Sequence, residues 1–120
     1  MNITIVTPWL NCHELIAAYE KAMSVLAEGD RLVIVDNAST PPIIVPSADE
    51  TVRLKRNLGF AGASNRGLRR VTTDAVLFLN NDVLMTSATW LQQIRAALRP
   101  GVLVGADLRT DNHCRVDGFL

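Results

Sequence analysis

Two short apolar runs, each ending abruptly in polar side chains, place the strongest constraint on how this chain folds. Residues 76–79 read Val-Leu-Phe-Leu and lead directly into Asn-Asn-Asp, and residues 32–35 read Leu-Val-Ile-Val before Asp-Asn. Continuous apolar runs of this length are typical of strands buried on both faces of a parallel sheet. Ligands of open α/β sheets gather at the carboxyl ends of such strands. The pattern therefore predicts two strand-end acids, Asp36 and Asp82, at one candidate site.

Strand and helix patterns alternate along nearly the whole chain. Asn11, with a glutamate three residues later, predicts a capped helix start, and Gly29 is expected to end that helix. Pro8 is expected to stop the ladder of the first strand. Alternating strands and helices predict an α/β fold, a mostly parallel sheet sandwiched by helices. The expected strands cover residues 2–7, 31–35, 51–55, 75–79 and 102–104, with a short edge strand at 43–45; further helices cover 60–71 and 86–98.

Length and composition narrow the possible classes of protein. The 120 residues suffice for a single domain, taken as 1–120. Lysine and arginine number 12, as do aspartate and glutamate, so the formal net charge is zero. That balance argues against nucleic acid as the main partner. The hydrophobic share of 48% is high for a small chain, and predicts apolar surface covered by further residues or by a second copy in a homodimer.

A glycine-rich segment, Asn57 to Gly67, stands where the chain turns from strand into helix. Its small residues would let a ligand approach the backbone closely, and a helix N-terminus attracts anions. Asn65 and Arg66 would then point into the same crevice. The alternative is that the glycines cap and turn, while Ala61, Ala63 and Gly67 let the helix pack closely on the sheet. The segment is neither Gly-x-Gly-x-x-Gly nor a P-loop, which counts against dinucleotide and Walker-type sites.

Taken in order, four motifs resemble those of family 2 glycosyltransferases with the GT-A fold, particularly the rhamnosyltransferase-like branch. They are Thr7-Pro8, Asp36-Asn37-Ala38-Ser39, Asn57-x-Gly59-Phe60-Ala61-Gly62-Ala63-x-Asn65-x-Gly67 and Leu79-Asn80-Asn81-Asp82-Val83. The resemblance covers nearly the whole chain, and the ordered set is more specific than any one motif. It implies the N-terminal nucleotide-binding portion of the fold, with the chain stopping where the acceptor half starts.

The resemblance implies roles for the residues around the nucleoside. Thr7 and Pro8 would flank the base, and Asp36 would accept a hydrogen bond from a ring nitrogen of uracil or thymine. The remaining residues of the base and ribose pocket would be Asn57, Gly62 and Asn65. The alternative for Asp36 is a loop residue that only makes local hydrogen bonds.

The resemblance also implies that Asn80-Asn81-Asp82 replaces the Asp-x-Asp motif of the family. Asp82 would hold Mg2+ or Mn2+ against the donor diphosphate, Asn80 would face the ribose, and Asn81 would lie beside the nucleotide. Breaking a sugar–phosphate bond leaves negative charge on the diphosphate, which a divalent ion offsets. One carboxylate with phosphate and water oxygens is enough to hold magnesium. The alternative for Asp82 is a turn aspartate or a helix cap.

The implied reaction is metal-assisted, inverting transfer of a sugar from a UDP- or dTDP-sugar to a hydroxyl of a saccharide or lipid-linked acceptor. Such a hexosyltransferase would build cell-envelope polysaccharide in the cytoplasm, at the inner face of the membrane. Asp117 is the one acid near the place of the catalytic base. The alternatives are a non-catalytic nucleotide-binding module or inactive fragment, a Rossmann-type oxidoreductase and a structural domain. The missing glycine fingerprint disfavours the oxidoreductase, and a structural domain leaves the strand-end acids unexplained.

Overall fold

The computed structural model describes residues 1–85, 87–105, 108–109 and 115–116. Its main sheet has four parallel strands in the order β3-β2-β1-β4. These are β1 (Ile3–Trp9), β2 (Arg31–Asp36), β3 (Glu50–Arg53) and β4 (Ala75–Phe78). A separate antiparallel pair is formed by β5 (Leu108–Arg109) and β6 (Arg115–Val116).

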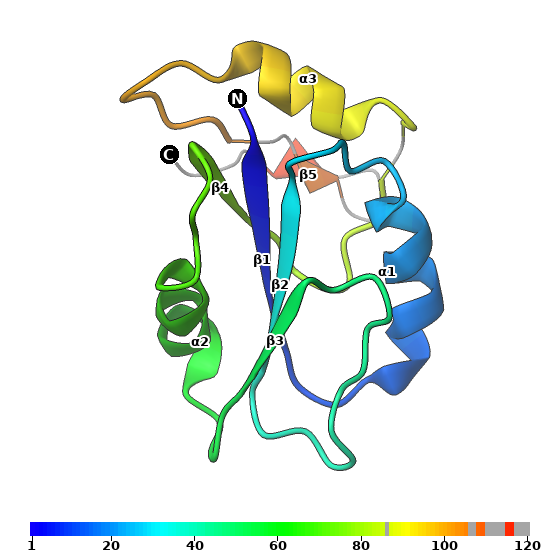
Figure 1. The fold of residues 1–120 in the computed structure, drawn as a ribbon. Helices are drawn as coiled ribbons and strands as arrows, with labels where there is room; N and C mark the ends of the chain where they lie inside the picture. The colour runs from blue at the N-terminus through cyan, green and yellow to red at the C-terminus, as the bar shows by residue number, and fades with distance from the viewer. Residues whose placement is uncertain (86, 106–107, 110–114, 117–120) are drawn as a thin grey trace.

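Helices cover both faces of the four-stranded sheet, so the predicted α/β fold class is confirmed (Figure 1). A turn of 3-10 helix, η1 (His13–Leu15), leads into α1 (Ile16–Met23) on one side, and α2 (Gly59–Leu68) lies on the other. The helix α3 (Trp90–Ala97) crosses the end of the sheet at which β1 begins. No helix within the described ranges is long and apolar enough to cross a bilayer.

The core has two layers because successive strand side chains point to opposite faces of the sheet. The face that α1 covers is built from Ile3, Ile5, Trp9, Leu32 and Ile34, with Tyr19, Met23 and Trp90 packed on it. On the α2 face the buried residues are Val6, Val33, Val35, Leu54 and Ala63. Burial on both faces explains why β2 is continuously apolar. The run in β4 was also expected to be buried, but β4 is an edge strand of this sheet, so it is only half-buried and Phe78 is exposed.

Gly67 sets the distance between α2 and the sheet. A Cβ atom at this position would lie 2.3 Å from Cγ1 of Val6 and 2.9 Å from Cγ2 of Val35. Both valines are fully buried in neighbouring strands, so they have no room to move aside. The interpretation of Gly67 as a close-packing residue is therefore confirmed.

Pro8 does not stop the first strand, contrary to the prediction. β1 continues to Trp9, with Pro8 opposite Val35 and Trp9 opposite Asp36. The carbonyl of Trp9 accepts a hydrogen bond on the β2 side, and that of Val6 accepts one on the β4 side. Because main-chain groups alternate in direction along a strand, the nitrogen of Pro8 faces the β4 side, beyond the last paired residue of β4. Its missing N–H therefore costs no ladder hydrogen bond.

Other local predictions were also wrong. Asn11 caps no helix; its side-chain oxygen instead accepts a hydrogen bond from the Thr40 N–H, at 3.0 Å. Gly29, at φ +90°, lies in a turn six residues beyond the last helical residue. Residues 43–45 form no strand and instead bury two apolar side chains in the core, while 102–104 are exposed and unpaired. At Asn11 and at residues 43–45, tertiary contacts rather than local propensity decide the conformation.

Candidate functional site

The candidate site lies at the carboxyl edge of the sheet, the lower end in Figure 1. All four strands are parallel, so their carboxyl ends and the loops that follow meet at this edge. The edge therefore gathers the ends of β1 and β2, the loop from β3 to α2 and the residues after β4. Every predicted site residue within the described ranges falls in these segments or in α2. The predicted catalytic candidate Asp117 lies outside the described residues.

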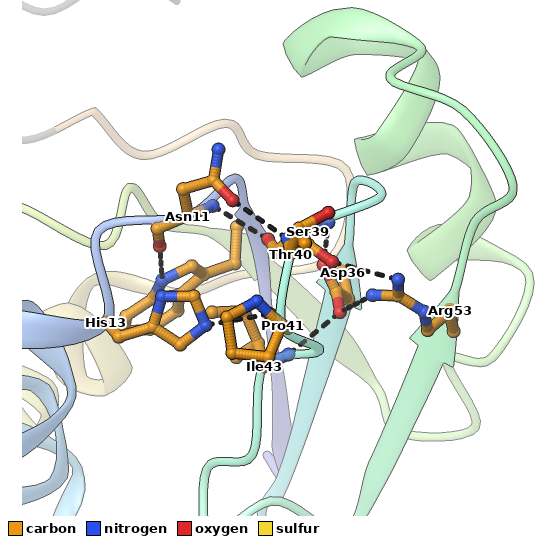
Figure 2. Close-up of polar contacts among 9 residues, drawn as sticks. Asn11, His13, Asp36, Ser39, Thr40, Pro41, Ile43 and Arg53 are labelled. Carbon is orange, nitrogen blue, oxygen red and sulfur yellow. Dashed lines mark hydrogen bonds and ion pairs between the residues drawn. The ribbon is translucent and has the colours of Figure 1, made fainter.

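Asp36 is fully buried at the end of β2, and both of its carboxylate oxygens are occupied (Figure 2). Oδ1 accepts a hydrogen bond from the Ser39 N–H at 2.9 Å, and Oδ2 accepts one from the Ile43 N–H at 2.9 Å. The guanidinium of Arg53 donates a further hydrogen bond to Oδ2. Burial acts to raise the pKa of this carboxyl, but these hydrogen bonds outweigh it and hold the pKa below the ordinary value.

This geometry assigns Asp36 to the support of its own loop. A nucleotide base could hydrogen-bond to the carboxylate only by displacing one of the present donors, because the side chain has no exposed surface. The alternative interpretation, a loop residue with local hydrogen bonds, describes its contacts in this structure.

Arg53 was not predicted as a site residue, although it completes the Asp36 network. The register of β2 and β3 sets Arg53 opposite Asp36, and its second guanidinium nitrogen donates to the Ser39 carbonyl at 2.8 Å. Arg53 thus links the loop after β2 to the end of β3. The strand expected at 51–55 would have put Arg53 in its middle, whereas β3 ends at Arg53. Its pairing with Asp36 depends on strand register, which is a property of tertiary structure.

A second set of contacts joins the loop after β1 to the loop after β2 (Figure 2). The Asn11 N–H donates to the Ser39 hydroxyl at 2.7 Å, and the Asn11 side chain accepts from the Thr40 N–H. Nε2 of His13 lies 2.8 Å from the carbonyl oxygen of Pro41. These bonds hold the two loops together as a preorganised wall at the edge of the sheet.

Asn37 fixes the start of α2 at the same edge. Its side chain is buried; Oδ1 accepts the Leu58 N–H at 2.8 Å and Nδ2 donates to the Gly59 carbonyl at 3.2 Å. Gly59 has φ +73°, and its own N–H donates to Asn57 Oδ1 at 2.8 Å. The turning role given to the glycines is therefore confirmed at Gly59, and the Asn57 side chain is engaged within the loop.

Thr7, which was predicted to flank a base, lies near the end of β1. Its side chain is buried under α1, where its hydroxyl lies 2.6 Å from the hydroxyl of Tyr19. Burial raises the pKa of Tyr19 above the ordinary value, so this pair stays neutral. Pro8 is half-buried at the end of β1, and Asn65 is exposed on α2. Gly62 is half-buried within α2.

Asp82 differs from Asp36 in its exposure and in its hydrogen bonding, two properties that bear on ion binding. It is exposed, and no side-chain hydrogen bond or ion pair joins it to another described residue. With Asn81 it lines a cavity of about 460 Å³ whose other walls come from α1 and the start of α3. Asn80 is exposed immediately before it. Among the described residues no three acidic, histidine or cysteine side chains cluster, so a divalent ion at Asp82 would take its remaining ligands from phosphate and water.

Comparison with known proteins finds a matching family model and a solved structure with a similar fold. The family model of glycosyl transferase family 2 matches residues 4–116. No curated protein sequence matches the chain. Among solved structures, that of S. aureus TarS residues 1–349 superimposes with a TM-score of 0.65 at 18% identity. The match covers 80% of this chain and 32% of the TarS chain, so this chain spans about a third of that structure. At this identity the match establishes the fold, which is of the GT-A type.

Proposed function

The chain belongs to glycosyltransferase family 2, and we propose that it binds the nucleotide-sugar donor of a sugar-transfer reaction. The donor would be a UDP- or dTDP-sugar, and the acceptor a hydroxyl group of a saccharide or a lipid-linked saccharide. The observation that carries the proposal is the contrast between the two strand-end acids. One is buried and fully hydrogen-bonded, whereas the other is exposed, lines a cavity and has no partner among the described residues.

The nucleoside would lie along the carboxyl edge, against the wall made by the loops after β1 and β2. Of the predicted contacts, Asn57, Asn65 and Asn80 are exposed and Pro8 is half-buried. Asp36 would act indirectly, because its hydrogen bond from the Ser39 N–H holds the conformation of the loop. A wall already fixed by internal hydrogen bonds loses little conformational entropy when the ligand binds.

The diphosphate would lie at Asn80-Asn81-Asp82, with Asp82 as the protein ligand of Mg2+ or Mn2+. Such an ion, when bound, neutralises the negative charge that develops on the diphosphate as the sugar leaves. The exposed carboxylate suits this role because it has no internal hydrogen bond to give up. Inversion at the sugar carbon, by direct attack of the acceptor hydroxyl, is part of the proposal. The catalytic base stays unassigned, since Asp117 lies outside the described residues.

Calorimetric titration tests the donor site directly. UDP, dTDP, GDP and NAD are titrated into the wild type, with and without Mn2+, and into Asp82→Asn. We expect UDP or dTDP to bind more tightly with Mn2+, and the variant to lose that gain while keeping its fold. Glu28→Gln, an exposed carboxylate on the turn before β2, serves as the control and should behave as the wild type.

The outcomes separate the proposal from its rivals. Binding of UDP that Mn2+ does not strengthen would leave a nucleotide-binding module without the proposed metal site. Tight binding of NAD in preference to UDP would favour an oxidoreductase. Absence of binding by every nucleotide would refute the donor-site proposal for this chain.

A further inference from the structure

The zero net charge of the chain conceals a marked separation of charge. The segment 53–70 contains six of the 12 lysines and arginines and none of the 12 acidic residues. It therefore carries six positive charges, balanced by six net negative charges in the rest of the chain. This segment comprises the end of β3, the following loop and α2 with its last turn. Half of the cations are thus gathered in one stretch of the chain that contains α2.

Four of these six cations surround one cavity. It has a volume of about 420 Å³ and lies between the end of β3 and α2; its lining is Arg53, Lys55, Arg56 and Arg66, with Leu54 and Leu58. All four cations are exposed, and no acid contributes to the lining. Only Arg53 pairs with a carboxylate among the described residues. Like charges that converge on a concave surface focus a positive potential and attract an anion.

Arg53 gives the cavity a fixed element. One side of its guanidinium is held by Asp36 and by the carbonyl of Ser39, so the side chain is oriented before any ligand arrives. An arginine restrained in this way loses little freedom on binding. Arginine forks also match the geometry of phosphate oxygens better than that of monatomic anions.

The lining of the basic cavity differs from the set of residues predicted for the donor site, although Arg56 and Arg66 adjoin Asn57 and Asn65 in the chain. None of the nine predicted nucleotide and metal residues contributes to its lining, and Asp82 lines a different cavity on the α1 side of the sheet. The Asp36–Arg53 pair also connects the two regions, since it belongs to the loop wall on one side and to the basic cavity on the other.

We propose that this basic cavity binds a phosphate-bearing group other than the donor nucleotide. The group is a soluble phosphate compound or the headgroup of an anionic lipid, which share the chemistry that the cavity recognises. The inference rests on the cavity and its charge, so it stands or falls independently of the donor site.

The test compares two charge reversals on α2 and its last turn. Arg66→Glu changes a residue of the cavity lining, whereas Arg69→Glu makes the same change of net charge three residues away, outside the lining. Inorganic pyrophosphate is titrated into each protein at fixed ionic strength, and sedimentation with phosphatidylglycerol or phosphatidylcholine vesicles tests the lipid source. Lys55→Glu provides a second lining variant, and circular dichroism checks that each variant is folded.

We expect pyrophosphate, the anionic vesicles or both to bind the wild type. Arg66→Glu and Lys55→Glu should each weaken that binding by about tenfold, the loss of one charge-assisted contact. Arg69→Glu should weaken it less than about threefold, because an exposed charge outside the cavity is screened by salt. Binding by pyrophosphate alone identifies a soluble ligand, and binding by the anionic vesicles alone identifies a headgroup.

Three results would overturn the proposal. The first is that neither probe binds, and the second is that Arg69→Glu weakens binding as much as Arg66→Glu, which indicates a diffuse charge effect. The third is that UDP displaces pyrophosphate competitively and Arg66→Glu weakens both equally, which makes the cavity part of the donor site. Failure of UDP to bind at all, with pyrophosphate binding intact, would refute only the donor site.

Discussion

Replacing Asp36 with asparagine tests whether the buried strand-end acid supports the loop wall. The carboxylate accepts hydrogen bonds from the main-chain N–H groups of Ser39 and Ile43 and from the guanidinium of Arg53. An asparagine of the same size has one acceptor oxygen and an NH2 group. In Asp36→Asn the NH2 group must face at least one of these three donors, so that the variant loses a hydrogen bond and leaves a buried donor unpaired.

The magnitude follows from these contacts. A hydrogen bond to a charged group contributes roughly 1.5–3 kcal/mol, and breaking a buried charge pair by removing one partner costs roughly 3–5 kcal/mol. The side chain of Arg53 is 44% exposed, so its share is reduced by solvent screening. We therefore expect Asp36→Asn to lower the free energy of unfolding by about 2–4 kcal/mol at pH 7, a large part of the roughly 5–15 kcal/mol typical of a domain.

The pH dependence provides a second readout. Because the folded-state pKa of Asp36 is lowered from its ordinary value of 3.8, its stabilisation is complete above that value and is lost as the pH falls towards the folded pKa. The difference in stability between wild type and Asp36→Asn should therefore shrink below about pH 4. A stability difference that stays constant down to acid pH would contradict the conclusion that the Asp36 carboxylate supports the loop.

Urea unfolding followed by tryptophan fluorescence measures both effects, because Trp9 and Trp90 are buried in the core. Asp82→Asn is the matched control, since it makes the same substitution at an exposed carboxylate. It should change the free energy of unfolding by less than about 0.5 kcal/mol while it removes the metal-dependent gain in UDP affinity. A loss below about 1 kcal/mol in Asp36→Asn would refute the supporting role.

Two further substitutions test the packing and the electrostatics of the fold. Gly67→Ala should destabilise by roughly 1–2 kcal/mol in the same urea assay, because the 2.3 Å approach to Val6 outweighs the roughly 1 kcal/mol helix-propensity gain; an unchanged or raised midpoint would contradict this. Burial raises the pKa of Asp30, but hydrogen bonds from Arg95 and two main-chain N–H groups lower it overall. Asp30→Asn should therefore destabilise above about pH 4, with a gap from wild type that closes in acid; a pH-independent gap would count against the ion pair.

The strands and the fold class were predictable because their signal is local. A continuous apolar run predicts a strand, and alternation with helices indicates a parallel sheet. The degree of burial was not local: β2 is buried, but β4 is only half-buried. The same local reasoning failed at Pro8 and at residues 43–45. The effect of the proline depends on where β4 ends, and the burial of 43–45 depends on a core that the segment itself does not contain.

The sequence alone determined that polar residues follow the strand ends, and the order of its motifs identified the family. It could not decide which strand-end acid is accessible, because Asp36 and Asp82 follow similar apolar runs. Only the tertiary structure made them different. The loop after β2 folds back over Asp36, and the register of β3 brings Arg53 to it, so that this carboxylate is buried and compensated. Asp82 has no such partner among the described residues. Which distant segments hydrogen-bond to a given carboxylate depends on their arrangement in space, and the local sequence does not specify that arrangement.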